Sequence, residues 1–297
     1  MARLTFSVLI VLLASAAGAQ DLEPRRYFNN PVGQNYFLAP LRYSYGEVNV
    51  TPSLPLDDAD LSLLAGSVAY LRSFDFGGRT ASFDAFLPLV CADGSAVLEG
   101  QRRTRETCGQ GDLRLRLVYN FVGAPALRLD EFVGRQRELV IGASIQVEAP
   151  IGQYDKAFLL NIGANRWILR PEIGMSVPLG RWSVEFAAGA RFFEDNDEFF
   201  GGSRLSQDPL YNLQTHVVYD LSPRQWLSIN ANYFFGGATF RDGMPSQIRQ
   251  GNSRLGVTWS IAANRQNVIQ LTANAGVVTR IGNDSTTFGV AWLRRWE

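Results

Sequence analysis

The chain has 297 residues, of which 46% are hydrophobic and 19% are charged. Lys+Arg and Asp+Glu both number 28, a balance that excludes a strongly basic nucleic-acid-binding protein. The mean hydropathy lies near zero, which is too apolar for a disordered chain and too polar for a bundle of membrane helices. With 2 cysteines and 1 histidine the chain has little material for a metal site, and we expect no cofactor.

Residues 1–19 have the features of a secretory signal peptide. Arg3 provides a positive start, residues 4–13 form an apolar run, and Ala17-Gly18-Ala19 is a small-residue cleavage site. The apolar run is about ten residues long, whereas a membrane-spanning helix needs about 20. We therefore expect residues 1–19 to be removed and the mature chain to be exported. The alternative is an uncleaved anchor that lies at the membrane surface.

From about residue 38 onward, apolar residues recur at every second position, which is the period of a β-strand. For example, Trp182, Val184 and Phe186 alternate with Ser183 and Glu185. Helical spacing is not sustained in the mature chain, so we predict an all-β protein. The runs between turn signals predict about twelve strands, at residues 38–50, 60–74, 79–90, 111–122, 137–149, 161–177, 181–193, 210–221, 225–236, 252–262, 267–279 and 286–296.

The lengths of these runs and of their connections favour a membrane barrel. Most runs reach the ~9–11 residues that cross a bilayer at a tilt, whereas ordinary strands average ~5–6. The even-numbered connections are mostly tight and the odd-numbered ones mostly longer, as in barrels with short periplasmic turns and long extracellular loops. Residues 123–136 and 280–285 depart from this alternation.

We therefore predict a transmembrane antiparallel up-and-down β-barrel of about 12 strands over residues 38–297, in the bacterial outer membrane. Residues 20–37 precede it as a periplasmic extension, as part of the first strand, or as a plug in the lumen. The expected partners are outer-membrane lipid and lipopolysaccharide, the barrel-assembly machinery, and a small-molecule solute.

A soluble β-sandwich is the alternative architecture, because its strands also alternate apolar and polar residues. In several predicted strands, however, aromatic residues stand at both ends of the apolar face with small residues between them. Trp182 and Phe192 flank Ala188 and Ala190 in this way. Aromatic girdles at two membrane interfaces produce this arrangement, whereas the core of a sandwich has its bulk in the middle. The pattern favours the membrane barrel.

Short segments stand out at residues 22–27, 31–33, 52–56, 149–155, 161–167, 195–197, 199–202, 207–211 and 282–284. They resemble a known family of outer-membrane transporters that is named for the meta-pathway of phenol degradation. The resemblance covers nearly the whole mature chain and implies an outer-membrane β-barrel that transports a solute. One departure is Glu297, which follows the terminal aromatic Trp296.

If the apolar face meets lipid, the opposite face lines the lumen. A charge that faces lipid near the midplane costs ~2–4 kcal/mol, so charged residues mark the luminal face. Both signs occur there, and strong ion selectivity is not predicted. The alternative is that these charges pair with one another and fill a narrow barrel. The side chains that we predict to line a solute path are Arg114, Arg116, Glu148, Arg166, Arg170, Glu172, Glu185, Arg191, His216, Asp220, Asn230, Asn232 and Arg254.

These features together predict an outer-membrane channel for passive uptake of small solutes, aromatic or hydrophobic ones included, and not an enzyme. The alternatives are a barrel enzyme of the phospholipase type and a structural barrel without transport. A phospholipase of this type needs a Ser–His pair. The histidine His216 is followed by Val217 and Val218, with no serine at the second position. We interpret His216 as a luminal hydrogen-bonding residue.

Two further features concern the predicted outer loops. Cys91 and Cys108 lie in one of these loops, at residues 91–110. In an exported protein such a pair predicts a disulfide, the alternative being two free thiols. The acidic run at residues 194–198 lacks the glycine and the spacing of a calcium-binding loop. We expect a solvated acidic loop there and no metal site.

Overall fold

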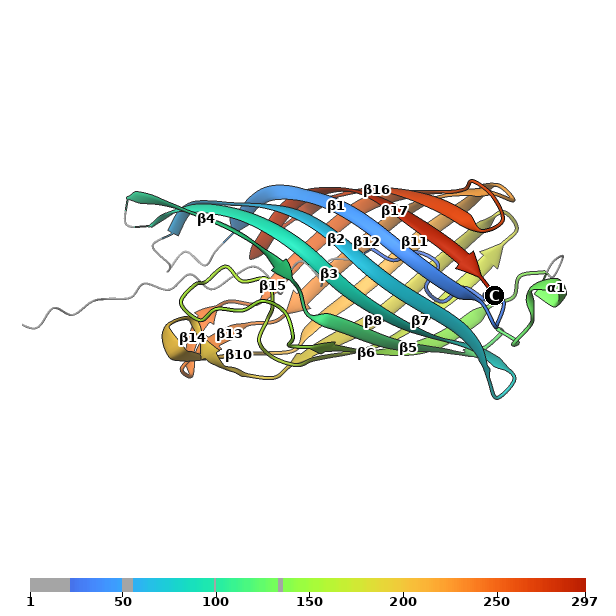
Figure 1. The fold of residues 1–297 in the computed structure, drawn as a ribbon, viewed down its shortest axis with the longest axis horizontal. Helices are drawn as coiled ribbons and strands as arrows, with labels where there is room; N and C mark the ends of the chain where they lie inside the picture. The colour runs from blue at the N-terminus through green and yellow to red at the C-terminus, as the bar shows by residue number, and fades with distance from the viewer. Residues whose placement is uncertain (1–21, 50–55, 99, 133–135) are drawn as a thin grey trace, which may run out of the picture.

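The computed structural model describes residues 22–49, 56–98, 100–132 and 136–297, and the predicted signal peptide lies outside these ranges. The chain forms a long antiparallel sheet that closes into a barrel, because its first strand pairs with its last (Figure 1). The barrel strands are β1 (Asn35–Asn49), β2 (Leu56–Phe76), β3 (Arg79–Leu98), β5 (Leu113–Val122), β6 (Val140–Ala149), β7 (Ile168–Leu179), β8 (Trp182–Phe193), β11 (Leu210–Ser222), β12 (Gln225–Gly236), β15 (Gln250–Ala262), β16 (Asn267–Val278) and β17 (Gly282–Trp296).

The alternation along each strand gives the two faces of the wall opposite chemistry. On β8, Phe186 is 46% exposed on the outer face, whereas its neighbour Glu185 is 5% exposed on the inner face. The same contrast recurs on β12, where Ile229 is 61% exposed and Asn230 is 1% exposed. An apolar outer face and a polar interior are the pattern of a transmembrane barrel. The predicted fold class is therefore confirmed.

Aromatic side chains gather toward both ends of the outer face. Toward one end the rings of Trp182 and Tyr219 lie 4.5 Å apart between centroids. Toward the other end Tyr211 stacks on Phe235 at 5.3 Å. Tyrosine and tryptophan at these levels place their polar groups in the headgroup region and their rings against lipid.

The connections differ between the two ends of the barrel (Figure 1). The tight turns lie at the end that also holds the C-terminus, and the short helix α1 (Leu129–Phe132) lies there too. The longer loops lie at the opposite end. We call the first the periplasmic end and the second the extracellular end, following the arrangement of outer-membrane barrels. In the described part of the chain, no helix is long and apolar enough to cross a membrane.

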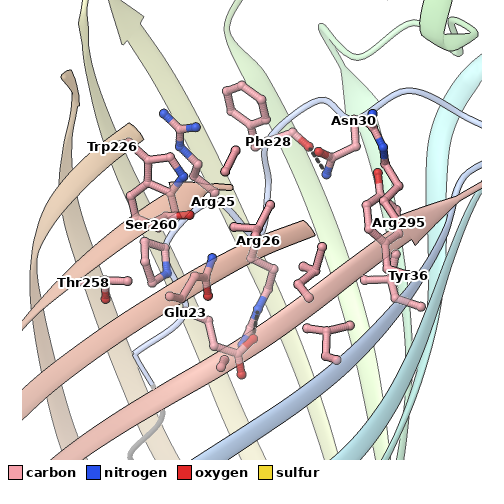
Figure 2. Close-up of a pocket in the computed structure, with 18 of the residues that line it drawn as sticks. Glu23, Arg25, Arg26, Phe28, Asn30, Tyr36, Trp226, Thr258, Ser260 and Arg295 are labelled. Carbon is pink, nitrogen blue, oxygen red and sulfur yellow. Dashed lines mark hydrogen bonds and ion pairs between the residues drawn. The ribbon is translucent and has the colours of Figure 1, made fainter. Parts of the chain in front are cut away.

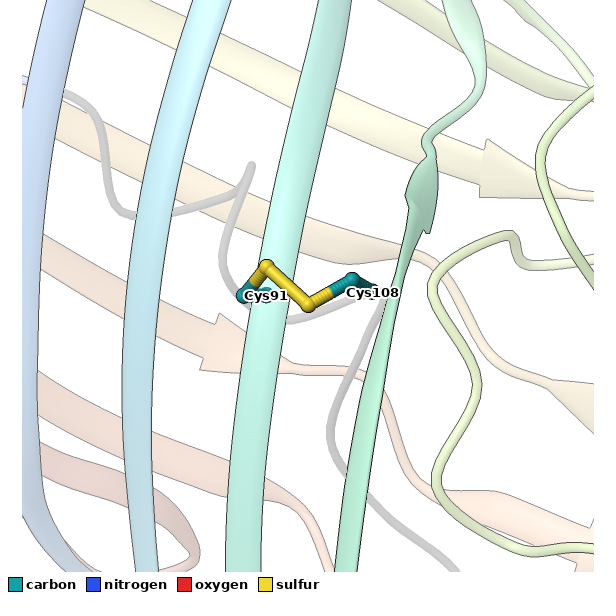
Figure 3. The surroundings of a disulfide bond; sticks show 2 residues. All are labelled: Cys91 and Cys108. Carbon is teal, nitrogen blue, oxygen red and sulfur yellow. A yellow bond between two sulfur atoms is a disulfide. The ribbon is translucent and has the colours of Figure 1, made fainter.

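The predicted outer loop at residues 91–110 is largely a β-hairpin. Strand β3 continues past its pairing with β5 and pairs instead with β4 (Gln101–Gln110). Cys91 and Cys108 are opposite each other in this ladder and form a disulfide (Figure 3). The disulfide prediction is confirmed, and the predicted outer loop is an ordered hairpin whose ladder satisfies the backbone groups of both arms.

The predicted strand at 161–177 begins only at Ile168, so its first seven positions were assigned wrongly. Residues before Ile168 belong to the loop that follows β6. Hydrogen bonds with side chains hold this loop in a folded conformation. Asp112 accepts hydrogen bonds from the backbone N–H groups of Gly152 and Ala164, at 2.9 and 2.7 Å. Burial raises the pKa of Asp112, and these two hydrogen bonds oppose that shift.

The extracellular loops build a second, small sheet from β9 (Asn196–Phe199), β10 (Ser203–Gln207), β13 (Thr239–Arg241) and β14 (Met244–Gln247), with the 3-10 turn η1 (Phe200–Gly202). Its acidic residues are paired with basic ones. Lys156 Nζ lies 2.8 Å from Glu198 Oε1, and Arg204 Nη2 lies 2.6 Å from Asp195 Oδ2. The ammonium of Lys156 holds the pKa of Glu198 below its usual value. Among the described residues, no cluster of three or more His, Cys, Asp or Glu could hold a metal ion.

Candidate functional site

The residues predicted to line a solute path carry their side chains on the inner face of the wall. Three of them, Arg114, Arg116 and Asp220, keep 20%, 16% and 16% of the side chain exposed. Whether a solute contacts any of these residues stays a prediction. The other members of the set are buried, namely Glu148, Arg166, Arg170, Glu172, Glu185, Arg191, His216, Asn230, Asn232 and Arg254.

Residues 22–34, which we call the luminal segment, lie inside the barrel (Figure 2). Arg25 Nη2 donates to Asp220 Oδ1 at 2.5 Å, and its backbone N–H donates to Glu185 Oε2 at 2.7 Å. Arg26 forms an ion pair with Glu172 of β7. The luminal segment ends where Asn35 begins β1.

Tyr27 fixes the middle of the luminal segment in a glycine-lined recess of the wall. Its side chain is 4% exposed, and its hydroxyl lies 3.0 Å from Ser144 Oγ and 3.1 Å from Glu172 Oε1. A Cβ atom on Gly174 would lie 2.2 Å from the tyrosine ring, and one on Gly142 would lie 2.9 Å from it. The two glycines therefore make room for a ring that any larger residue would displace.

The luminal segment enters the lumen from the periplasmic end. The backbone N–H of Val32 donates to the carbonyl of Leu127 at 2.8 Å, and that of Gly33 donates to the carbonyl of Ser73 at 2.9 Å. Ser73 Oγ also donates to the carbonyl of Pro31 at 2.7 Å. The segment is thus held at the periplasmic rim and runs from there toward the middle of the barrel.

Charges on the inner wall pair with one another and with the luminal segment. Arg116 donates from Nε and Nη2 to Asp84 Oδ2 at 2.8 and 2.5 Å, and from Nη1 to Glu23 Oε2 at 2.7 Å. Arg170 Nη2 lies 2.9 Å from Glu172 Oε2. Guanidinium groups with two or three partners hold a fixed geometry. The luminal segment is therefore fastened to the wall by several charged hydrogen bonds.

A cavity of about 1560 Å³ lies between the luminal segment and the wall in the periplasmic half of the barrel. It reaches the periplasmic turns, since Pro223 and Gln266 line it as well. Aromatic rings line it near these turns, where the Arg25 guanidinium lies 4.9 Å from the ring centre of Phe28 and 4.8 Å from that of Trp226 (Figure 2). A space of this size admits a small organic molecule.

His216 is part of a hydrogen-bonded chain across three strands. Its Nδ1 lies 2.8 Å from Asn230 Oδ1, and Asn230 Nδ2 donates to Thr258 Oγ1 at 3.1 Å. The partner of the histidine ring in this chain is thus an amide. This arrangement fits the luminal hydrogen-bonding role that we predicted for His216.

Several residues of the site were missed by the sequence reasoning. Glu23, Arg25, Arg26 and Tyr27 lie in a segment without regular secondary structure, so no period indicates which way their side chains point. Asp84 did carry a signal, because it alternates with apolar neighbours inside a predicted strand. A charge in such a position marks the luminal face.

Comparisons with known proteins agree with this architecture. An outer membrane channel from Pseudomonas putida F1, of the group COG4313, is similar with 22% identity and a TM-score of 0.80, over 93% of this chain and 100% of that chain. The transport unit of the autotransporter AIDA-I from Escherichia coli is similar at 8% identity and a TM-score of 0.56, over 96% and 95% of the two chains.

The β domain of the Bordetella autotransporter BrkA gives 12% identity and a TM-score of 0.54, over 89% of this chain and 100% of that chain. At these identities the solved structures show the fold, which points to the bacterial outer membrane. No curated protein sequence matches the chain. A family model described as "Putative MetA-pathway of phenol degradation" matches residues 42–294, and the chain therefore belongs to this family.

Proposed function

We propose that this protein is an outer-membrane channel that admits small solutes by passive diffusion, aromatic or hydrophobic ones included. The observation that carries the proposal is the polar-walled lumen, whose periplasmic half holds a cavity of about 1560 Å³ open to the periplasmic turns. Barrels with fewer strands fill their interior with side chains, and those with more leave a wide pore. An interior of intermediate width suits a selective passage.

The family description and a similar solved structure support this proposal. The family is described by a pathway of phenol degradation, and the protein from Pseudomonas putida F1 is an outer membrane channel. Phenol-like rings are small enough for the cavity, and the aromatic side chains Phe28 and Trp226 on its wall offer stacking partners. Residues 1–19 serve in this proposal as the cleaved export signal.

The luminal segment closes the passage in this proposal. Before Asn35, where the chain continues into β1, the described part of the segment is held by charged hydrogen bonds, by one buried ring and by backbone hydrogen bonds at the periplasmic rim, and it belongs to no strand of the wall. Such contacts can be released and remade, whereas the strands of the wall cannot separate without unfolding. We therefore expect the segment to leave the lumen while the barrel stays intact.

Planar-bilayer recording of the refolded mature chain tests this function. We compare residues 20–297 with a variant that lacks residues 20–31, and with residues 20–297 carrying Glu106→Gln, an exposed position on β4. We expect stepwise conductance from all three, about several-fold larger after the deletion because the lumen is wider. Absence of conductance from every form, together with hydrolysis of the bilayer lipid, would favour the phospholipase alternative.

A further inference from the structure

We propose that the extracellular half of the lumen selects solutes that carry a carboxylate on an aromatic ring, through Arg166, Arg191 and the amides of Asn212 and Gln214. This inference rests on the channel function proposed above. Its basis is a group of buried cationic and amide donors that lies next to an apolar surface, on the inner face of adjacent strands.

The donors come from neighbouring positions of the inner wall. Arg191 on β8 is the register partner of Leu210 on β11, and Asn212 follows two residues later on the same face. Gln214 on β11 is opposite Asn232 on β12. Arg166, immediately before β7, is 3% exposed, and Arg191 is 2% exposed. These four side chains are buried at neighbouring positions of the inner wall, and we call them the patch.

The positive charge of this patch is only partly compensated. Glu148 pairs with Arg191 and also, at 3.9 Å, with Arg114. Arg166 donates to a neutral acceptor, Gln207 Oε1, at 2.5 Å, and stacks on the ring of Phe193 at 4.6 Å. Burial and the nearby Arg191 lower the pKa of Arg166 to about 10, and the charges of Asp195 and Glu148 oppose this shift only in part.

Several donors of the patch have no acceptor among the residues that the structure describes. They are Arg166 Nη1, Arg191 Nε and Nη1, Asn212 Nδ2 and Gln214 Nε2. Buried donors are ordinarily satisfied, and each exception calls for an explanation. A carboxylate has two oxygens that accept from guanidinium and amide groups at once, so a passing carboxylate satisfies donors that the wall leaves open.

An apolar surface lies next to these donors. Leu210 and Phe234 are buried against each other and against the partly buried Phe193. Leu210 is the register partner of Arg191, and Phe234 is the register partner of Asn212. Both side chains are buried in the structure, so a solute ring that enters here has to move them aside, and its carboxylate then lies next to the donors. The patch thus suits both parts of an aromatic carboxylate.

The charges around the periplasmic cavity also favour negatively charged solutes. Ten arginines line it and only three carboxylates, namely Glu23, Asp84 and Asp220. The charges of the strands alone predict no strong ion selectivity, and the arginines of the luminal segment and of the turns add positive charge to them. An excess of one charge sign along a narrow passage favours solutes of the opposite sign.

Flux into proteoliposomes that contain the mature chain tests this inference. The probes are benzoate, benzylammonium and benzyl alcohol, which share one ring and differ in charge. We expect benzoate to enter about tenfold faster than benzylammonium at equal gradients. Equal flux of the two ions, or faster flux of benzylammonium, would overturn the selectivity while leaving the channel function standing. Absence of flux of all three probes would overturn both.

Variants locate the selectivity in the patch. Arg166→Gln should reduce the ratio of benzoate to benzylammonium flux several-fold, whereas Arg166→Lys, which keeps the charge, should retain most of it. Arg204→Gln is the matched control, because Arg204 is an exposed arginine in the extracellular loops with its own acidic partners. An unchanged ratio in Arg166→Gln, or an equal fall in Arg204→Gln, contradicts the assignment. If Arg166→Gln does not fold, Gln214→Leu replaces it in the same comparison.

Discussion

The outer surface and the interior of this barrel are built from the same strands, but they depend on different kinds of contact. On the outer surface Leu117 and Phe186 need only to be apolar, because lipid accepts any such side chain. Inside, Glu172 binds Arg170 on its own strand together with Arg26 and Tyr27 from the luminal segment. The outer surface therefore accepts any apolar side chain and follows from the local strand pattern, whereas the interior depends on particular partners far apart in the sequence.

The largest effect is expected from removing a charge that the interior shares. Glu172→Gln leaves two buried guanidinium groups, Arg26 and Arg170, without their common carboxylate, which costs about 3–5 kcal/mol. The measurement is the urea midpoint of unfolding from lipid vesicles. Glu106→Gln, at an exposed position on β4, is the control and should leave the midpoint unchanged. Equal midpoints for the two variants would show that the interior network does not stabilise the fold.

The next effect tests the outer surface. Leu117→Arg places a charge against lipid and should cost ~2–4 kcal/mol, whereas Val118→Arg places the same charge on the wall of the cavity and should cost less. Folding yield into vesicles and the urea midpoint both report the difference. Similar losses of stability in the two variants would mean that the lipid-facing and luminal positions of this strand have been assigned wrongly.

A smaller effect concerns the hairpin outside the membrane. Replacing Cys91 and Cys108 together by serine removes the disulfide, which joins two positions with a sequence separation of 17. A disulfide that closes a loop of this length stabilises the folded state by up to about 3 kcal/mol. Because β4 pairs only with β3 among the barrel strands, we expect most of the loss to be local. Protease cleavage between the two positions should become faster, while the barrel itself still folds. Resistance equal to that of the wild type would contradict this role of the disulfide.

The smallest change in stability is expected where the luminal segment meets the wall. Gly174→Ala would place a Cβ 2.2 Å from the ring of Tyr27, and overpacking of this kind costs about 1–3 kcal/mol. The segment should detach, so trypsin should cleave at Arg25 and Arg26 and the conductance should rise. Gly66→Ala, whose nearest contact would be 3.8 Å, serves as the control. Continued protection of both arginines would show that the ring does not hold the segment.

The fold was predictable from the sequence because strand alternation is a local property. The runs ending at Phe193 and beginning at Leu210 were placed correctly, since each shows the period of two over its length. The hairpin of β4 was not predicted, because Gln101–Gln110 is polar throughout and gains its structure only by pairing with β3. The contacts of Arg25 with Asp220 and of Arg26 with Glu172 join residues more than a hundred positions apart, and no local pattern encodes them.

Fluorescence of two tryptophans at the same height tests the central claim of the account most directly. Trp259 on β15 is 40% exposed on the outer face, and its register partner Leu227 is the neighbour of Trp226, which lines the cavity inside. In vesicles of brominated lipid, a chain with Trp259 as its sole tryptophan should be strongly quenched, and a chain with only Trp226 should not be. Equal quenching of the two chains would contradict a barrel with lipid outside and a solute-accessible lumen within.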